Sequence, residues 1–131
     1  MPVSPRDAIV HTPADLFALW QSLLGDAGFG LRTLWLVFLY EDGQVAPVIL
    51  PVEGIPLRPD HMVANLGSII ADLNEDGVSS AAMLLSRPGP RAMTDDDRAW
   101  ARALAPFTPW PVHLATADDL QVFAPDDLIA A

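Results

Sequence analysis

Hydrophobic positions along the chain repeat with two different spacings, one typical of helices and one of strands. From Leu16 to Leu24, apolar residues recur three and four positions apart, as in a helix that buries one face. Thr12 fits the N-cap of this helix and Pro13 its first position, where the missing N–H costs nothing. A second helix with one apolar face is predicted from Asp60 to Leu73.

Two strand-like runs lie between these helices. Residues 34–40 are apolar throughout, which is typical of a strand covered on both faces. Residues 41–44 form a turn whose Asp-Gly pair predicts a two-residue type I′ hairpin. The returning run, 45–52, contains Pro47 and Pro51, and proline cannot donate a hydrogen bond to a strand ladder. This strand is therefore predicted at an edge of the sheet.

The stretch from Ser79 to Leu104 combines a strand, a rigid loop and a capped helix. The apolar run 81–85 predicts a buried strand, and the Pro-Gly-Pro sequence after it predicts a stiff loop. Thr94 is the expected N-cap of a helix over 94–105, because its hydroxyl can accept a backbone N–H of the first turn. The three aspartates at 95–97 would lie at the positive end of the helix dipole.

The predicted element order is α-β-β-α-β-α-β-β, with 112–116 and 120–124 forming a final hairpin. This order predicts an α/β (α+β) fold of three layers, in which helices cover a mixed sheet of about five strands. The 131 residues fit one domain. Residues 1–11 are expected to form a loosely attached N-terminal arm, because Pro2 and Pro5 oppose helix.

The segment LLSRPG at 84–89, followed by Thr94-x-x-Asp97, resembles RadC-like proteins of the JAB/MPN metalloprotease-like group. In that group a strand ends in His-x-His-Pro-Ser-Gly, and a helix start bearing Ser and Asp follows. Aligned on the proline, with one residue deleted, the two zinc-binding histidines become Leu85 and Arg87, and only Asp97 falls on a ligand position. The resemblance implies a JAB/RadC or deaminase-like fold for the C-terminal half. It argues against the hydrolytic chemistry of the family.

Composition excludes several classes of function. There is no cysteine, so disulfides, thiolate nucleophiles and cysteine-based metal sites are absent, and a cytoplasmic location is the expectation. The net charge is −10 and all seven basic residues are arginine, which disfavours nucleic-acid binding. No apolar run approaches the ~20 residues of a membrane span, and the N-terminus lacks a signal-peptide pattern.

Candidate metal and nucleophile positions have structural explanations. His11, His61 and His113 lack the spacing of metal ligands, and helix capping is the expected role of Asp97, so no metal or other cofactor is predicted. Ser86 precedes a helix but lacks the glycines of a nucleophile elbow, and it is expected to be a polar strand end. The paired carboxylates occur at turns and helix starts, where aspartate is favoured structurally.

Four of the seven arginines lie within sixteen residues: Arg87, Arg91, Arg98 and Arg102. Arg87 and Arg91 flank the Pro-Gly-Pro turn, and with the Thr94–Asp97 helix start they could hold a phosphate or carboxylate. The alternative is that Asp95–Asp97 neutralise Arg87 and Arg91 as surface ion pairs.

Two functions follow from the sequence. The first is a non-catalytic interaction or scaffold domain with a RadC/JAB-like fold that has lost its metal site. The second is a hydrolase or anion-ligand binder that uses the Arg87/Arg91 loop and the Thr94–Asp97 helix start.

The amount of hydrophobic sequence predicts self-association as a homodimer. Hydrophobic residues make up 51% of the chain, which is more than one sheet of this size is expected to bury. A further protein partner fits the first function, and neither nucleic acid nor membrane is expected.

Overall fold

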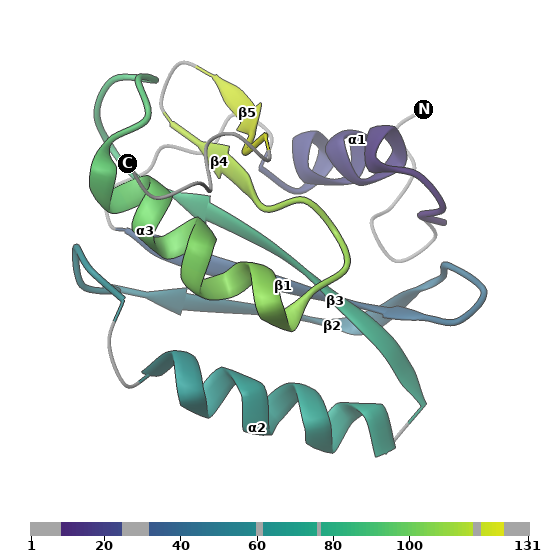
Figure 1. The fold of residues 1–131 in the computed structure, drawn as a ribbon. Helices are drawn as coiled ribbons and strands as arrows, with labels where there is room; N and C mark the ends of the chain where they lie inside the picture. Colours follow the sequence, from purple (N-terminus) through teal and green to yellow (C-terminus); the bar gives the residue numbers. More distant parts are fainter. Residues whose placement is uncertain (1–8, 25–31, 60–61, 76, 117–118, 125–131) are drawn as a thin grey trace.

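The computed structural model describes residues 9–24, 32–59, 62–75, 77–116 and 119–124 (Figure 1). The helices are α1 (Pro13–Leu24), α2 (Met62–Glu75) and α3 (Asp95–Leu104), and a 3₁₀ turn (Ala105–Phe107) continues α3. The strands are β1 (Thr33–Tyr40), β2 (Val45–Glu53), β3 (Val78–Ser86), β4 (His113–Ala115) and β5 (Leu120–Val122). The element order predicted from the sequence is confirmed.

The named strands form a five-stranded mixed sheet in the order β2-β1-β3-β4-β5. β1 is antiparallel to both β2 and β3, β3 is parallel to β4, and β4 is antiparallel to β5. The proline-bearing strand β2 lies at one edge of the sheet, as its two prolines predict. The apolar strands β1 and β3 lie in the interior, which explains why both lack an alternating polar face.

Helices cover both faces of this sheet, so the predicted three-layer α/β arrangement is confirmed (Figure 1). Because strand side chains alternate between faces, β1 and β3 supply both halves of the core. On one face, Leu16 and Trp20 of α1 pack with residues such as Val37. On the other, Leu66 of α2 and Trp100 of α3 pack with the intervening residues of the same strands.

The turn between β1 and β2 differs from the predicted two-residue type I′ hairpin. Gly43 has φ +90°, but its neighbour Asp42 does not have a positive φ, whereas type I′ needs one at both central positions. The backbone N–H of Gly43 donates to the Tyr40 carbonyl, and that of Tyr40 donates to the Gln44 carbonyl. The connection is therefore a three-residue loop with glycine at its last position.

The end of the predicted N-terminal arm is attached to the domain. Ile9 forms a β-bridge with Gln44, and the Val10 side chain is buried in the core beneath α1. Thr12 then caps α1 as predicted, accepting the N–H of Asp15 while the Asp15 carboxylate accepts the N–H of Thr12. Residues 1–8 of the arm lie outside the described part of the chain.

Within the described ranges, none of the helices combines the length and the apolar character that spanning a membrane requires.

Candidate functional site

The first turn of α3 is closed by a capping box. The Thr94 hydroxyl accepts the Asp97 N–H over 3.1 Å, and the Asp97 carboxylate accepts the Thr94 N–H over 2.9 Å. These two bonds satisfy backbone donors that have no partner within the helix. The prediction that Thr94 caps this helix is confirmed.

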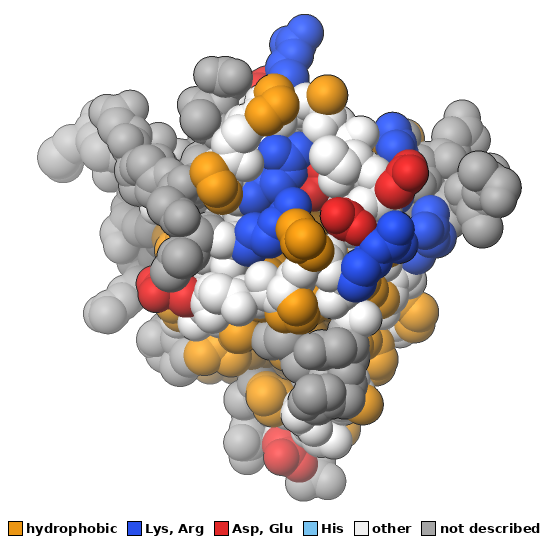
Figure 2. Space-filling view, turned by 90° about the vertical axis from the view of Figure 1, so that its left-hand side faces the viewer, with side chains coloured by type: hydrophobic (Ala, Val, Ile, Leu, Met, Phe, Trp, Pro, Cys, Tyr) orange, Lys and Arg blue, Asp and Glu red, His pale blue; other side chains and the backbone are white. Residues whose placement is uncertain are grey.

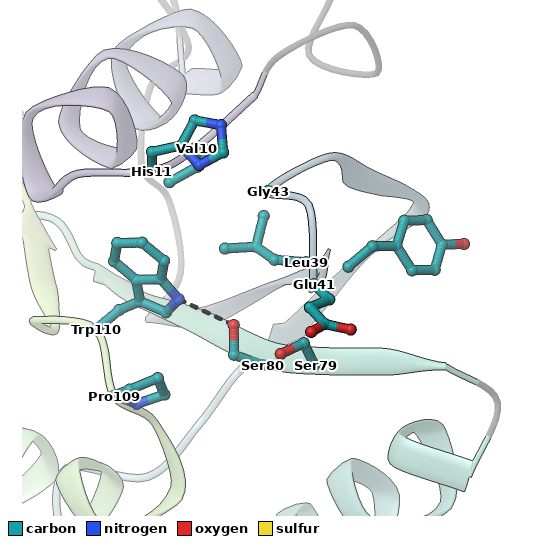
Figure 3. Close-up of a pocket in the computed structure, with 10 residues that line it drawn as sticks. Val10, His11, Leu39, Glu41, Gly43, Ser79, Ser80, Pro109 and Trp110 are labelled. Atoms are coloured by element: carbon teal, nitrogen blue, oxygen red, sulfur yellow. Dashed lines mark hydrogen bonds between the residues drawn. The ribbon is translucent and has the colours of Figure 1, made fainter.

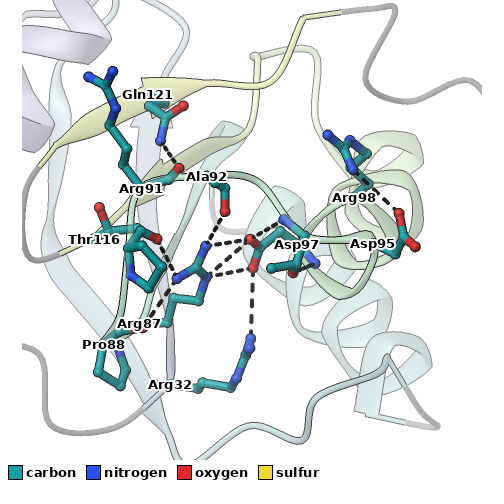
Figure 4. Close-up of polar contacts among 12 residues, drawn as sticks. Arg32, Arg87, Pro88, Arg91, Ala92, Asp95, Asp97, Arg98, Thr116 and Gln121 are labelled. Carbon is teal, nitrogen blue, oxygen red and sulfur yellow. Dashed lines mark hydrogen bonds and ion pairs between the residues drawn. The ribbon is translucent and has the colours of Figure 1, made fainter.

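Asp97 also accepts hydrogen bonds from Arg87, the first residue after β3 (Figure 4). Nε of Arg87 lies 2.9 Å from Oδ1 of Asp97, and Nη2 lies 2.8 Å from Oδ2. Arg87 is 4% exposed and Asp97 only 1% exposed. The pair is thus a buried, two-pronged ion pair, which is the strong geometry for an arginine and a carboxylate. It joins the end of β3 to the start of α3.

The remaining donors of Arg87 bind the loop that connects these two elements. Nη1 donates to the carbonyls of Pro88 and Pro90, and Nη2 donates to that of Ala92 over 2.9 Å. A guanidinium has five N–H donors, so all of them have partners inside the protein. Gly89, with φ +101°, allows the loop to turn around the side chain, since other residues rarely adopt this conformation.

Asp97 is held as a carboxylate despite its burial. Burial alone would raise its pKa, but the hydrogen bonds from Arg87 and from the Thr94 backbone outweigh this and lower the pKa below the usual 3.8. Nη1 of Arg32 lies 3.8 Å from Oδ1 and adds a second, weaker positive charge. The site therefore contains a stable anion surrounded by donors.

Figure 2 shows further arginine and acidic side chains next to one another on one face of the molecule. Three pairs form there: Arg58 with Asp96 at 2.6 Å, Arg98 with Asp95 at 3.4 Å, and Arg91 with Asp119 at 3.7 Å. The expected neutralisation of Arg87 by the helix-start aspartates thus takes place through Asp97, but in a buried pair. Arg91 instead faces Asp119 of the β4–β5 connection.

Arg102, the fourth arginine of the predicted cluster, makes no ion pair with any described residue. Arg32 and Arg58 also belong to the cluster, although their positions in the sequence do not indicate it. Both lie more than 35 residues before Asp95–Asp97. No local pattern in the sequence indicates such long-range pairs.

Ser86 and His113 take part in separate structural contacts. Ser86 is buried and its Oγ accepts the indole N–H of Trp35 over 2.9 Å. In the parallel β3–β4 ladder, Ser86 is opposite Ala115, whereas His113 is opposite Leu84. Nδ1 of His113 faces the Pro111 carbonyl at 3.2 Å, and burial lowers the pKa of His113 to about 4. His113 is therefore a neutral core residue at pH 7.

The described residues contain no group of three or more His, Asp or Glu side chains placed to hold a metal ion. His11 lies before α1 and His113 in β4, and the third histidine, His61, is outside the described ranges.

No known family model matches the chain, and no curated protein matches it either. The resemblance of residues 84–97 to RadC-like proteins stays a prediction.

Proposed function

We propose that this protein is a non-catalytic interaction domain with a RadC/JAB-like core in which an arginine stands where the family holds a metal. It acts by associating with other proteins, including a second copy of itself. The observation that carries this proposal is the buried pair of Arg87 and Asp97.

The resemblance aligns Arg87 with a zinc-binding histidine and Asp97 with the aspartate ligand. In the structure these two side chains meet directly. The guanidinium supplies the positive charge that a metal would otherwise supply to the carboxylate. Because all five of its donors are used inside the protein, Arg87 has none left to orient a substrate or a water.

Surface features support an association function. Several large hydrophobic side chains are exposed on the described part of the chain: Ile9, Leu57, Ile69 and Val122. Val122 belongs to β5, the last strand of the sheet, and an edge strand presents backbone groups to which another chain can bind. The opposite edge, β2, is protected by Pro47 and Pro51.

Charge distribution also supports pairing with a second copy. Five of the six described arginines pair with Asp95, Asp96, Asp97 or Asp119. Carboxylates such as Glu41, Asp42 and Asp72 lie elsewhere, on elements that carry no described arginine. The arginine-bearing face is therefore close to neutral although the chain has a net charge of −10, so two copies repel one another least when they meet through it.

Sedimentation equilibrium at micromolar concentration tests the association. The expected result is a dimer at 0.15 M salt. A Val122→Asp variant should shift the equilibrium towards monomer, with Ala71→Asp as a control that places the same charge on an exposed position of α2. A 14 kDa species at every concentration and salt would refute the proposal.

The second candidate function is an anion-ligand binder that uses the Arg87/Arg91 loop. The observation in its favour is Arg91, whose side chain is 73% exposed and 3.7 Å from its carboxylate partner. A thermal-shift series with phosphate distinguishes the two functions. A saturable rise in melting temperature that Arg91→Gln abolishes would favour the anion binder, and an unchanged melting temperature favours the interaction domain.

A further inference from the structure

A cleft of about 310 Å³ lies at the end of the sheet opposite to Arg87 (Figure 3). Its floor is the end of β1 and the start of β3, including Leu39, Ser79 and Ser80. Val10 and His11 bound it from the segment before α1, Glu41 and Gly43 from the β1–β2 turn, and Trp110 from the loop before β4. Four separate parts of the chain thus meet around one cleft, whose volume is at the lower end for small-molecule sites.

The segment before α1 is fixed against the β1–β2 turn. The Val10 N–H donates to the Gly43 carbonyl over 2.8 Å, next to the bridge between Ile9 and Gln44. A Cβ at Gly43 would lie 2.7 Å from the Val10 oxygen and 2.9 Å from Cε1 of His11. This close approach requires glycine, so the wall that His11 contributes is built into the fold.

The opposite wall is held by the hydrogen bonds of Trp110. Its indole N–H donates to Oγ of Ser80 over 2.9 Å (Figure 3). Its backbone N–H donates to Oγ1 of Thr108 over 3.1 Å. The indole is only partly buried, so part of this large apolar surface faces the cleft. This part of the indole gives the cleft an apolar side.

The charged side of the cleft is negative. Glu41 is the only carboxylate among its described lining residues, none of which is an arginine. Asp42 follows in the same turn and adds a second negative charge nearby. From Ser80 to Arg87 the chain advances seven residues, a span of roughly 23 Å along a strand. This exceeds the Debye length of ~8 Å at physiological salt, so the arginine cluster does not neutralise the cleft.

We propose that this cleft binds a small organic cation, a primary amine or a quaternary ammonium group. Its charge lies near the Glu41 carboxylate, and its carbon atoms pack against Trp110. Negative clefts concentrate cations, and indole attracts ammonium groups more strongly than other aromatic rings do. Ser79, at the edge of β3, supplies a hydroxyl that can accept an N–H of a primary amine.

An NMR titration of the full chain with tetramethylammonium chloride tests this site. tert-Butanol is the control ligand, because it has a similar size and no charge, and sodium chloride at equal ionic strength is the control for screening. The expected result is a saturable shift of the Trp110 indole N–H and of the amide signals of Gly43 and Ser79. Neither tert-butanol nor sodium chloride should produce it.

Two matched variants remove one carboxylate each. Glu41→Gln should weaken tetramethylammonium binding about fivefold, the effect expected for an exposed charge pair. Glu53→Gln removes an exposed carboxylate at the other end of β2 and should leave binding unchanged. Equal shifts with tert-butanol, shifts that do not saturate, or equal affinities for both variants would overturn the proposal.

Discussion

Nη2 of Arg87 donates to Oδ2 of Asp97 over 2.8 Å, and the same carboxylate oxygen accepts the backbone N–H of Thr94. One buried oxygen thus connects the end of a central strand, the loop after it and the first turn of α3. A buried charge is costly unless it is paired and hydrogen-bonded, and here both conditions are met.

Removing either partner of this pair should strongly destabilise the domain. Arg87→Gln leaves the buried carboxylate with only the more distant charge of Arg32, and Asp97→Asn leaves a buried guanidinium without a countercharge. Breaking a buried pair in this way costs about 3–5 kcal/mol. Arg98→Gln, which removes the more exposed pair with Asp95, is the control and should change the free energy of unfolding by less than ~1 kcal/mol.

Urea denaturation measures these free energies. The double variant should be less destabilised than the sum of the two single variants, because the second change no longer breaks a pair. Additive effects would mean that Arg87 and Asp97 are not coupled, contrary to the geometry described above.

The hydroxyl of Thr94 should stabilise the domain independently of the Arg87–Asp97 pair. Thr94→Ala removes the acceptor for the Asp97 N–H and should lower the free energy of unfolding by about 1 kcal/mol. Thr94→Ser keeps an acceptor and should recover most of the loss. Equal denaturation midpoints for the alanine variant and the original chain would show that the cap does not stabilise the helix.

His113 should make the stability of the domain depend on pH. Burial lowers its folded-state pKa to about 4 from 6.5, so the unfolded chain binds the proton more tightly. The contribution of neutral His113 is complete above pH 6.5 and is lost as the pH falls towards 4. The shift corresponds to about 3 kcal/mol in this window.

The measurement is the free energy of unfolding between pH 7 and pH 4, compared with that of His113→Gln. The variant should lose less stability on acidification than the original chain. Parallel curves for His113→Gln and the original chain would contradict the assignment of a buried neutral histidine.

Much of the fold could be predicted because its signals are local. Thr12 and Thr94 both precede an acidic residue by three positions, and each forms the capping box that this spacing favours. Pro47 and Pro51 place β2 at an edge for a reason contained in the residues themselves. The predicted type I′ turn at Asp42-Gly43 was wrong. An Asp-Gly pair can also end a three-residue loop, in which only the glycine needs a positive φ.

The contacts of the site are less visible in the sequence because they join distant segments. The charges between residues 87 and 97 predict that Arg87 forms an ion pair with an aspartate. They do not predict that the loop after Arg87 buries the guanidinium. The bond from Trp35 to Ser86 spans 51 residues and depends on the register of β1 with β3. The cleft beside Glu41 has no sequence signature, since four separate segments form it.

We propose that the Arg87 guanidinium takes the place of a metal ion beside Asp97. Metal content of the purified protein tests it most directly, measured by elemental analysis after incubation with excess zinc and dialysis. Far less than one zinc per chain is expected, both for the original protein and for Asp97→Asn. One tightly bound zinc per chain that Asp97→Asn abolishes would contradict it.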